Sequence, residues 1–290
     1  MTNQVFLVTG GARGLGRDIV EAALTAGHSV VAGARSPAQL DDLVAEFPGQ
    51  IVAVALDVTN PDAAAAAVRA ATDAFGRLDV VVSNAGYADL ASIEDVSLDD
   101  FRAQIETNLF GVVNVTKAAL PVLRAQGDGH IIQVSSVGGR SASPGLGAYQ
   151  SAKWAVGGFS GVLSAEVASL GIKVTVLEPG GMRTDWAGSS MSIPPISEPY
   201  DATVGARARS MKTWNPSGDP SKVAQVVLEI AGMENPPLRL LLGSDAYRYG
   251  TEIGAMQAAS DLKWRDLSQS IDHDEATEAD TDPLAAANQK

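Results

Sequence analysis

A tyrosine and a lysine stand four residues apart in the segment YQSAK, at Tyr149 and Lys153. Residues at i and i+4 are neighbours on one helix face, so a helix here would bring the ammonium group close to the phenol. A phenol titrates near pH 10 in water, and lowering its pKa to about 7 takes about 4 kcal/mol. A unit charge about 4 Å away supplies about 4 kcal/mol at an effective dielectric constant of about 20. The spacing therefore predicts a tyrosine adapted to general acid–base chemistry.

A glycine-rich turn follows the first apolar run, where TGGARGLG contains Gly10, Gly14 and Gly16. Glycines let the backbone turn tightly and approach a pyrophosphate, which binds at a helix N-terminus where amide hydrogens are unpaired. An ordinary strand-to-helix turn is the alternative for such a cluster. Its position directly after the first apolar run and before a helical pattern favours a dinucleotide site.

The end of the second apolar run lacks the acid that usually holds the ribose hydroxyl in folds that prefer NAD. It reads GARS, so that Arg35 stands there, and Arg13 lies within the glycine turn. Two guanidinium groups would suit a 2′-phosphate, although both could be ordinary solvated side chains. The sequence predicts NADP(H), with NAD(H) as the less favoured alternative. Asp57, after the third run, is expected to bind the adenine amino group or else to serve as a cap or turn residue.

Short apolar runs alternate with longer helix-like stretches along most of the chain. The runs are continuous rather than alternating, as in strands that are buried on both faces of a parallel sheet. They lie at 5–9, 29–34, 51–56, 78–84, 130–136, 172–179 and 238–243. This order predicts an α/β fold: a single Rossmann-type, doubly wound domain with a seven-stranded, mostly parallel sheet and helices on both faces. Ligand loops would lie at the carboxyl ends of the strands.

Three further polar residues fall at strand ends or on the helices between them: Asn84 in SNAG, Asn108 in NLFG and Ser136 in VSS. Each is ordinary by itself. Together with the glycine turn, YQSAK and PGGMRT at 179–184, their order and spacing make residues 4–245 resemble the short-chain dehydrogenase/reductase family of the compact type. The later segment PPLRLLLGSDA resembles the branch of 17β-hydroxysteroid and retinol dehydrogenase-like enzymes.

The resemblance implies an NADPH-dependent oxidoreductase that transfers a hydride between the nicotinamide and a hydrophobic ketone or secondary alcohol, as a carbonyl reductase does. Tyr149 would be the general acid and base, and Ser136 would hold the substrate oxygen. Lys153 would also bind the nicotinamide ribose, and Asn108 would order a water that relays protons. An NAD-linked alcohol dehydrogenase and a non-catalytic NADP(H)-sensing regulator remain as alternatives.

The expected cofactor contacts come from the glycine turn, the strand ends, the YQSAK helix and the PGGMRT segment. They are Gly10, Arg13, Gly14, Leu15, Gly16, Arg35, Asp57, Val58, Asn84, Ala85, Gly86, Tyr149, Lys153, Pro179, Gly180 and Thr184.

A looser segment at about 186–215 is expected to form a lid over the substrate within a catalytic domain that spans 1–270. Its large apolar side chains predict a hydrophobic substrate, unless they pack on the core instead. They are Trp186, Met191, Ile193, Ile196, Tyr200, Met211 and Trp214. The remaining residues, 271–290, carry six acids between Asp272 and Asp282 and predict a disordered tail.

Composition argues against several other classes. The net charge of −13 disfavours nucleic acid and anionic membranes as partners. The chain has no cysteine, and His28, His130 and His273 show no ligand spacing, so we expect no metal site. No apolar run approaches the roughly 18 residues of a membrane span, and no signal peptide is recognisable. These features predict a cytoplasmic protein.

The stretch 149–170 is apolar around much of its predicted helical circumference and contains Gly157, Gly158 and Gly161. Such a helix suits packing against a partner as well as against the sheet. We expect a homodimer or a homotetramer, with no preference between them.

Overall fold

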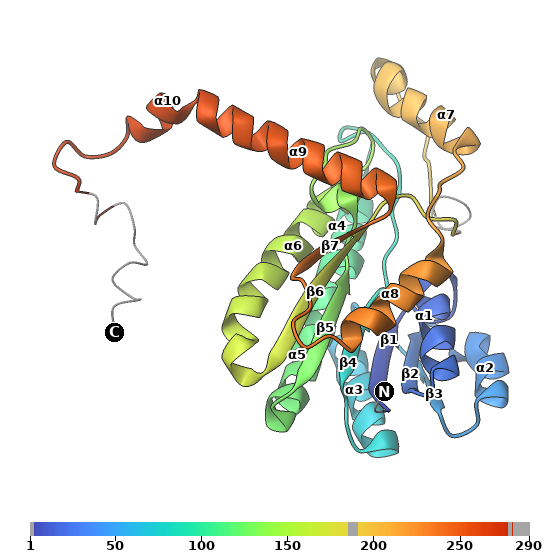
Figure 1. Ribbon diagram of the computed structural model, residues 1–290. Coiled ribbons are helices and arrows are strands. Elements are labelled where there is room, and N and C mark those ends of the chain that lie inside the picture. The colour runs from blue at the N-terminus through green and yellow to red at the C-terminus, as the bar shows by residue number, and fades with distance from the viewer. Residues whose placement is uncertain (1–2, 185–190, 278–279, 281–290) are drawn as a thin grey trace. The chain divides into compact units, whose positions relative to one another are not determined.

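Seven parallel strands form the centre of residues 3–250 in the computed structural model (Figure 1), which describes residues 3–184, 191–277 and 280. The strands are β1 (Val5–Thr9), β2 (Ser29–Ala34), β3 (Ile51–Ala55), β4 (Val80–Ser83), β5 (Gly129–Val134), β6 (Ile172–Pro179) and β7 (Arg239–Leu242). Their order is β3-β2-β1-β4-β5-β6-β7, and all six pairings are parallel. The predicted α/β fold is confirmed, with an entirely parallel sheet rather than a mostly parallel one. The strand order reverses between β1 and β4, which is where such sheets bind ligands.

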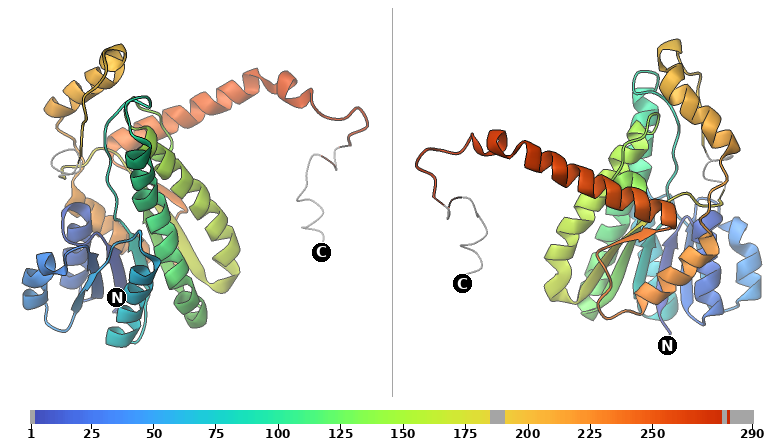
Figure 2. Two further views of the ribbon diagram at one scale, coloured as in Figure 1. Left: turned by 180° about the vertical axis from the view of Figure 1, so that it is seen from behind. Right: turned by 45° about the horizontal axis from the view of Figure 1, so that its top comes forward.

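Helices cover both faces of the sheet (Figure 2), because successive strand residues point to opposite sides. Phe6 and Val8 of β1 face α1 (Gly14–Thr25), α2 (Asp41–Glu46) and α8 (Pro220–Ala231). Val5 and Leu7 face α3 (Pro61–Phe75), α5 (Gly111–Gln126) and α6 (Gly147–Val167). Each fully buried side chain of this size contributes about 1.5–3 kcal/mol, so both layers hold the strand ends firmly in place.

The predicted long helix between β4 and β5 is present, and it contains an irregular turn. α4 (Leu98–Ile105) begins at Ser97, whose Oγ accepts a hydrogen bond from the Asp100 amide at 3.0 Å. Residues 106–110 then form a π-helical turn before α5 begins at Gly111. A π-turn widens the helix by one residue, and such turns occur often at functional sites. Asn108 lies in the middle of this one.

Short helical segments complete the part of the chain up to Gly250. Single 3₁₀ turns lie at Pro37–Leu40, Val137–Gly139, Ala168–Leu170 and Glu198–Tyr200. A second π-turn at Asp201–Gly205 precedes α7 (Ala206–Thr213), which belongs to the predicted lid.

Contacts between residues divide the chain at Gly250, within α9 (Ser244–Lys263). The second unit contains the rest of α9 and α10 (Arg265–Gln269). The predicted domain end at residue 270 and the disorder of 271–290 stay predictions, because 278–279 and 281–290 lie outside the described residues. No helix in the described ranges is long and apolar enough to cross a bilayer. The cellular location stays a prediction.

Candidate active site

The glycine turn between β1 and α1 has a backbone that side chains would disrupt. Gly10 and Gly14 have φ angles of 67° and 52°, in the left-handed region that favours glycine. A Cβ on Gly16 would lie 2.2 Å from the Gly10 carbonyl oxygen and 2.4 Å from Nδ2 of Asn84. The turn leads directly into the N-terminus of α1, so its backbone and the first α1 amides form a cradle of the kind that fits a pyrophosphate.

The end of β4 is hydrogen-bonded to the end of β1. The backbone amides of Asn84 and Ala85 both donate to Oγ1 of Thr9 at 2.9 Å, and Nδ2 of Asn84 donates to the Thr9 carbonyl at 3.0 Å. A Cβ on Gly86 would lie 2.5 Å from Oδ1 of Asn108 and 3.5 Å from Nζ of Lys153. The SNAG segment therefore joins the glycine turn to two of the predicted catalytic side chains.

Tyr149, Lys153 and Ser136 meet at the carboxyl ends of β4 and β5. The side chains of Ser136 and Tyr149 are hydrogen-bonded to each other, and Oγ of Ser136 also accepts from the Gly138 amide at 3.0 Å. Nζ of Lys153 lies 5.6 Å from the centre of the Tyr149 ring and donates to the Val134 carbonyl at 2.8 Å. The i, i+4 spacing thus brings the two side chains together on the buried face of α6.

The pKa of Tyr149 differs from the sequence expectation. Burial raises the pKa of Tyr149 to about 12, and the hydrogen bond from Ser136 acts in the opposite direction. Burial also lowers the pKa of Lys153 to about 8. The expected lowering of the phenol pKa by Lys153 is therefore wrong for the protein by itself, because loss of water around both groups favours their neutral forms.

Asn108 is fully buried in the π-turn and uses only one end of its amide. Its Nδ2 donates to the Tyr87 carbonyl at 2.8 Å and to the Gln104 carbonyl at 2.9 Å. Its Oδ1 has no hydrogen-bond partner within the described chain, and it faces Gly86. A buried acceptor of this kind normally has a partner, and a water molecule would supply one.

The residues predicted to hold the adenosine end are exposed. The guanidinium groups of Arg13 and Arg35 form no hydrogen bond within the described residues, whereas Arg17 forms ion pairs with Glu21 and Asp42. The two predicted cations therefore remain available for a ligand at this edge of the sheet.

Asp57 has the turn role that the sequence left open as an alternative. Its Oδ1 accepts from the amide and the hydroxyl of Thr59 at 3.0 and 2.8 Å, and these bonds lower the pKa of Asp57. The adjacent Val58 accepts a hydrogen bond from Nδ2 of Asn114 at 3.0 Å and packs against Gly111. This contact fastens the end of β3 to α5.

The segment after β6 lies beside the glycine turn. Pro179 ends the strand, and the Gly180 amide donates to the Leu242 carbonyl at 2.9 Å. Cβ and Cγ2 of Thr184 are the nearest atoms that a Cβ on Gly14 would meet, at 3.7 and 3.8 Å. The predicted contacts with the pyrophosphate and with the nicotinamide are thus neighbours in space.

The predicted lid packs against Tyr149. An apolar cluster contains Tyr149, Ala88, Leu90, Leu146, Val204 and Ala208, with Met191, Ile196, Tyr200 and Met211 packed on it. Ile193 and Trp214 are instead 41% and 45% exposed, and Trp186 lies outside the described residues. Four of the seven predicted lid side chains therefore contribute to apolar surroundings of the tyrosine.

Comparison with known proteins identifies the family. A family model described as short chain dehydrogenase matches residues 4–192. The chain belongs to the short-chain dehydrogenase family. It is 57% identical over 268 residues to the oxidoreductase BOA17 of Botryotinia fuckeliana (strain B05.10), covering 91% of this chain and 98% of that protein.

Two solved structures of short-chain dehydrogenases extend this likeness to the fold. One from Streptomyces avermitilis has a TM-score of 0.88 and 35% identity, covering 94% of this chain and 100% of the other. One from Burkholderia cenocepacia J2315, in complex with NADP, has a TM-score of 0.73 and 26% identity, covering 90% and 97%. The chain is thus an oxidoreductase of this family. The relatives named here include no hydroxysteroid or retinol dehydrogenase, so that branch stays a prediction.

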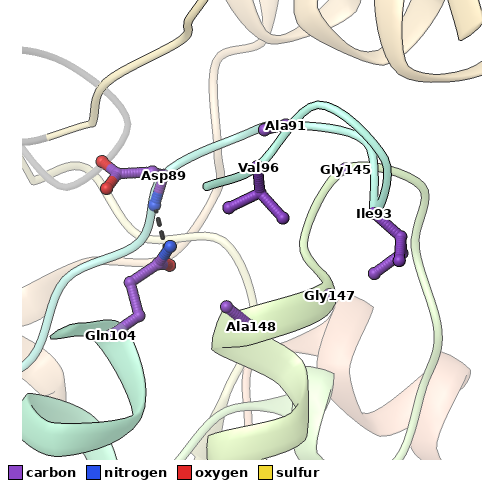
Figure 3. A pocket seen from close by; sticks show the side chains of 8 residues that line it. All are labelled: Asp89, Ala91, Ile93, Val96, Gln104, Gly145, Gly147 and Ala148. Atoms are coloured by element: carbon purple, nitrogen blue, oxygen red, sulfur yellow. Dashed lines mark hydrogen bonds between the residues drawn. The ribbon is translucent and has the colours of Figure 1, made fainter. Parts of the chain in front are cut away.

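This short-chain dehydrogenase also has a small pocket between the start of α6 and the segment after β4, which the sequence did not indicate (Figure 3). Its volume is about 10 Å³, roughly the minimum for one water molecule. The Asp89 amide donates to Oε1 of the buried Gln104 at the wall of this pocket, at 3.0 Å.

Sequence reasoning missed Gln104 and Asn114, because their partners lie on other elements and follow no local motif.

Proposed function

We propose that the protein is an NADPH-dependent oxidoreductase that interconverts hydrophobic ketones and secondary alcohols, with Tyr149 as the general acid and base. One observation carries this proposal. The Tyr149 hydroxyl is hydrogen-bonded to Ser136 and Lys153 lies against its ring, at the sheet edge that also presents the glycine turn. An acid, an oxygen-binding hydroxyl and a phosphate cradle at one edge are the parts that carbonyl reduction requires.

The residues at this edge fit a dinucleotide. The glycine turn would bind the pyrophosphate, Asp57 the adenine, and Pro179, Gly180 and Thr184 the nicotinamide. Arg13 and Arg35 would bind a 2′-phosphate, which favours NADP(H) over NAD(H). The NADP complex of the Burkholderia cenocepacia relative supports this choice. When bound, the reduced nicotinamide supplies the hydride.

The side chains of this protein would handle the proton. Ser136 donates to the substrate carbonyl oxygen and holds it beside the Tyr149 hydroxyl. Because the pKa of Tyr149 is about 12, the phenol is protonated at neutral pH and ready to give its proton to that oxygen. Lys153 lies 5.6 Å from the ring centre, where its positive charge stabilises the phenolate left behind. Asn108 would then order the water that returns a proton.

The apolar cluster around Tyr149 favours a hydrophobic substrate. Its members come from the segment after β4, from α6 and from the lid, so a substrate that reaches the tyrosine is enclosed by aliphatic side chains. A polar substrate would lose its hydration there without gaining hydrogen bonds, which costs free energy.

We also infer self-association through α6. Trp154 and Val162 are 46% and 61% exposed on this helix, and a Cβ on Gly158 or Gly161 would meet nothing within 4 Å. A second copy would cover this surface closely as a homodimer or homotetramer. Light scattering of a purified sample tests this, and a monomer at micromolar concentration contradicts it.

The Tyr149→Phe variant tests the catalytic proposal. It keeps the ring and removes the proton, so NADPH oxidation with a panel of apolar ketones should fall by about 10²–10⁴-fold. Tyr249→Phe, at a half-exposed position on α9, serves as the control and should match the wild type. Equal rates for wild type and Tyr149→Phe would defeat the assignment. NADPH binding without turnover by the wild type would favour the sensing regulator instead.

A further inference from the structure

A carboxylate fastens the segment after β6 to the beginning of α9. Asp245 lies in the first turn of α9, and its Oδ2 accepts a hydrogen bond from the Gly181 amide at 2.8 Å. The preceding amide, of Gly180, donates to the Leu242 carbonyl at the end of β7 at 2.9 Å. Two consecutive amides of the predicted nicotinamide loop are therefore held by the junction between β7 and α9.

The carboxylate is fitted against two glycines that have no room for a side chain. A Cβ on Gly180 would lie 2.2 Å from Oδ1 of Asp245 and 2.4 Å from its Oδ2, and a Cβ on Gly243 would lie 2.7 Å from Oδ1. The Oδ1 atom is buried and has no hydrogen-bond partner in the described part of the chain. An acid in the first turn of a helix stabilises the helix N-terminus, and this one in addition accepts a hydrogen bond from the backbone of a neighbouring loop.

Gly181 also anchors the base of the lid. Its carbonyl accepts from the Gly218 amide at 3.0 Å, and the Arg183 amide donates to the Gly218 carbonyl at 3.0 Å. A Cβ on Gly181 would lie 2.2 Å from Cη2 and Cζ2 of Trp214, so that indole ring rests on the Gly181 backbone. The nicotinamide loop, the lid and the start of α9 thus meet at one residue.

We propose that Asp245 is a positioning residue that holds the loop from Pro179 to Thr184 where it meets the nicotinamide half of the dinucleotide. This inference rests on the proposed function. Asp245 acts through the Gly181 amide, and without it that partly buried N–H loses its acceptor and the loop can move relative to the glycine turn. The adenosine half would bind as before, because Arg13, Arg35 and Asp57 lie on other strand ends.

The experiment compares two ligands that differ only in the nicotinamide. Calorimetric titration gives the dissociation constants of NADP⁺ and of 2′-phospho-ADP-ribose, which lacks that ring. In Asp245→Ala the constant for NADP⁺ should rise about tenfold, and that for 2′-phospho-ADP-ribose should change by less than about twofold. Asp245→Asn keeps an oxygen that can accept from Gly181 and should retain most of the affinity.

Asp79→Asn is the matched control. Asp79 is a buried carboxylate that likewise accepts a backbone hydrogen bond, from Val5 at 2.7 Å, but it lies at the opposite ends of the strands. This variant should leave the ratio of the two constants unchanged. If Asp245→Ala does not fold, Gly243→Ala gives the same test, since its added methyl group would lie 2.7 Å from Oδ1 and displace the carboxylate.

The outcomes separate the two proposals. An unchanged ratio in Asp245→Ala, or an equal loss for both ligands, overturns the positioning role and leaves the proposed function standing. A wild-type protein that binds neither ligand overturns the proposed function and the positioning role with it. A selective loss of NADP⁺ affinity that Asp245→Asn restores establishes the role.

Discussion

The polar groups at the amino ends of the parallel strands, here called the amino edge, differ in their hydrogen bonding from those at the carboxyl ends, here called the carboxyl edge. At the amino ends of the strands, the Val5 amide donates to Asp79 at 2.7 Å, and Gln126 exchanges two hydrogen bonds with the backbone of Leu78 at 2.6 and 3.0 Å. At the carboxyl ends, the buried oxygens Oδ1 of Asn108 and Oδ1 of Asp245 have no partner among the described residues. Nearly all buried polar groups in folded proteins are paired. At the amino edge most of these groups are therefore paired within the protein, with His130 as an exception, whereas the carboxyl edge leaves two buried oxygens without a partner, as the proposed cofactor site would require.

His130 is the exception at the amino edge. Its Nε2 lies 2.9 Å from the hydroxyl of Thr175, but its buried Nδ1 forms no hydrogen bond of ordinary geometry among the described residues. Burial accordingly lowers the pKa of His130 to about 4. We therefore expect this unpaired group to affect the dependence of stability on pH, and those at the other edge to affect the proposed cofactor binding.

The largest effect is expected when Lys153 at the carboxyl edge is replaced. Lys153→Met fills a similar volume without charge, so NADPH-dependent ketone reduction should fall by about a thousandfold, within the usual range for loss of acid–base assistance. Folding stability should not fall, because burying the Lys153 ammonium is unfavourable below about pH 8. Steady-state rates and urea unfolding at pH 7 measure the two quantities.

Lys173→Met is the matched control for that variant. Nζ of Lys173 also donates to a backbone carbonyl, that of Met233 at 3.3 Å, but near the amino end of β6. Its activity per folded molecule should equal that of the wild type. Equal losses in the two variants would mean that the edges do not differ in function.

The next effect concerns stability at the amino edge and its dependence on pH. The unfolded chain takes up a proton at His130 as the pH falls through 6.5, whereas the folded protein does so only near pH 4. The contribution of neutral His130 to the free energy of unfolding is therefore present above pH 6.5 and is lost between about pH 6.5 and pH 4. This contribution amounts to about 3 kcal/mol.

Urea unfolding of wild type and His130→Gln across this range measures that loss. The glutamine does not titrate, so the difference in unfolding free energy between the two proteins should change by about 3 kcal/mol between pH 7 and pH 4. Activity per folded molecule at pH 7 should be unchanged. A difference that stays constant with pH would show that His130 is not the group that titrates.

The smallest effect is expected for Arg35, which we compare with Arg77. Arg35 at the carboxyl edge has no hydrogen-bond partner among the described residues, whereas Arg77 at the amino edge is paired with Asp79 at 2.6 Å. Arg35→Asp should lower kcat/KM for NADPH relative to NADH by about tenfold or more, because it removes a cation from the 2′-phosphate and adds a repulsive charge.

Arg77→Gln should leave the ratio of kcat/KM for NADPH and NADH unchanged. It should lower the free energy of unfolding by less than about 1 kcal/mol, since the Arg77 guanidinium is half exposed. Rates with both coenzymes in the three proteins measure the effect. A wild type that already prefers NADH would refute the proposed roles of Arg13 and Arg35.

Local sequence was sufficient for the strands and for the grouping of the main motifs. Continuous apolar runs such as VFLVT predicted buried parallel strands, and parallel strands necessarily bring their carboxyl ends to one edge. The spacing of Tyr149 and Lys153 likewise put them on one helix face, and the structure places Nζ near the ring. These features depend on periodicity over a few residues, which can be read without a tertiary structure.

Contacts between distant segments were decided only by the folded chain. Asp245 and Gly181 are 64 residues apart, and nothing local to either residue predicts their hydrogen bond. Asn108 in the π-turn likewise donates to the Tyr87 carbonyl, 21 residues away, which no local motif predicts.

The pKa of Tyr149 marks the limit of sequence reasoning most clearly. Residue types and spacing determined that a phenol and an ammonium group would be neighbours, because residues four apart lie on the same face of a helix. The direction of the shift depends on how completely both groups are removed from water, which only the packing of α6, the SNAG segment and the lid decides. Spacing is a local property of a chain, and burial is a property of the whole fold.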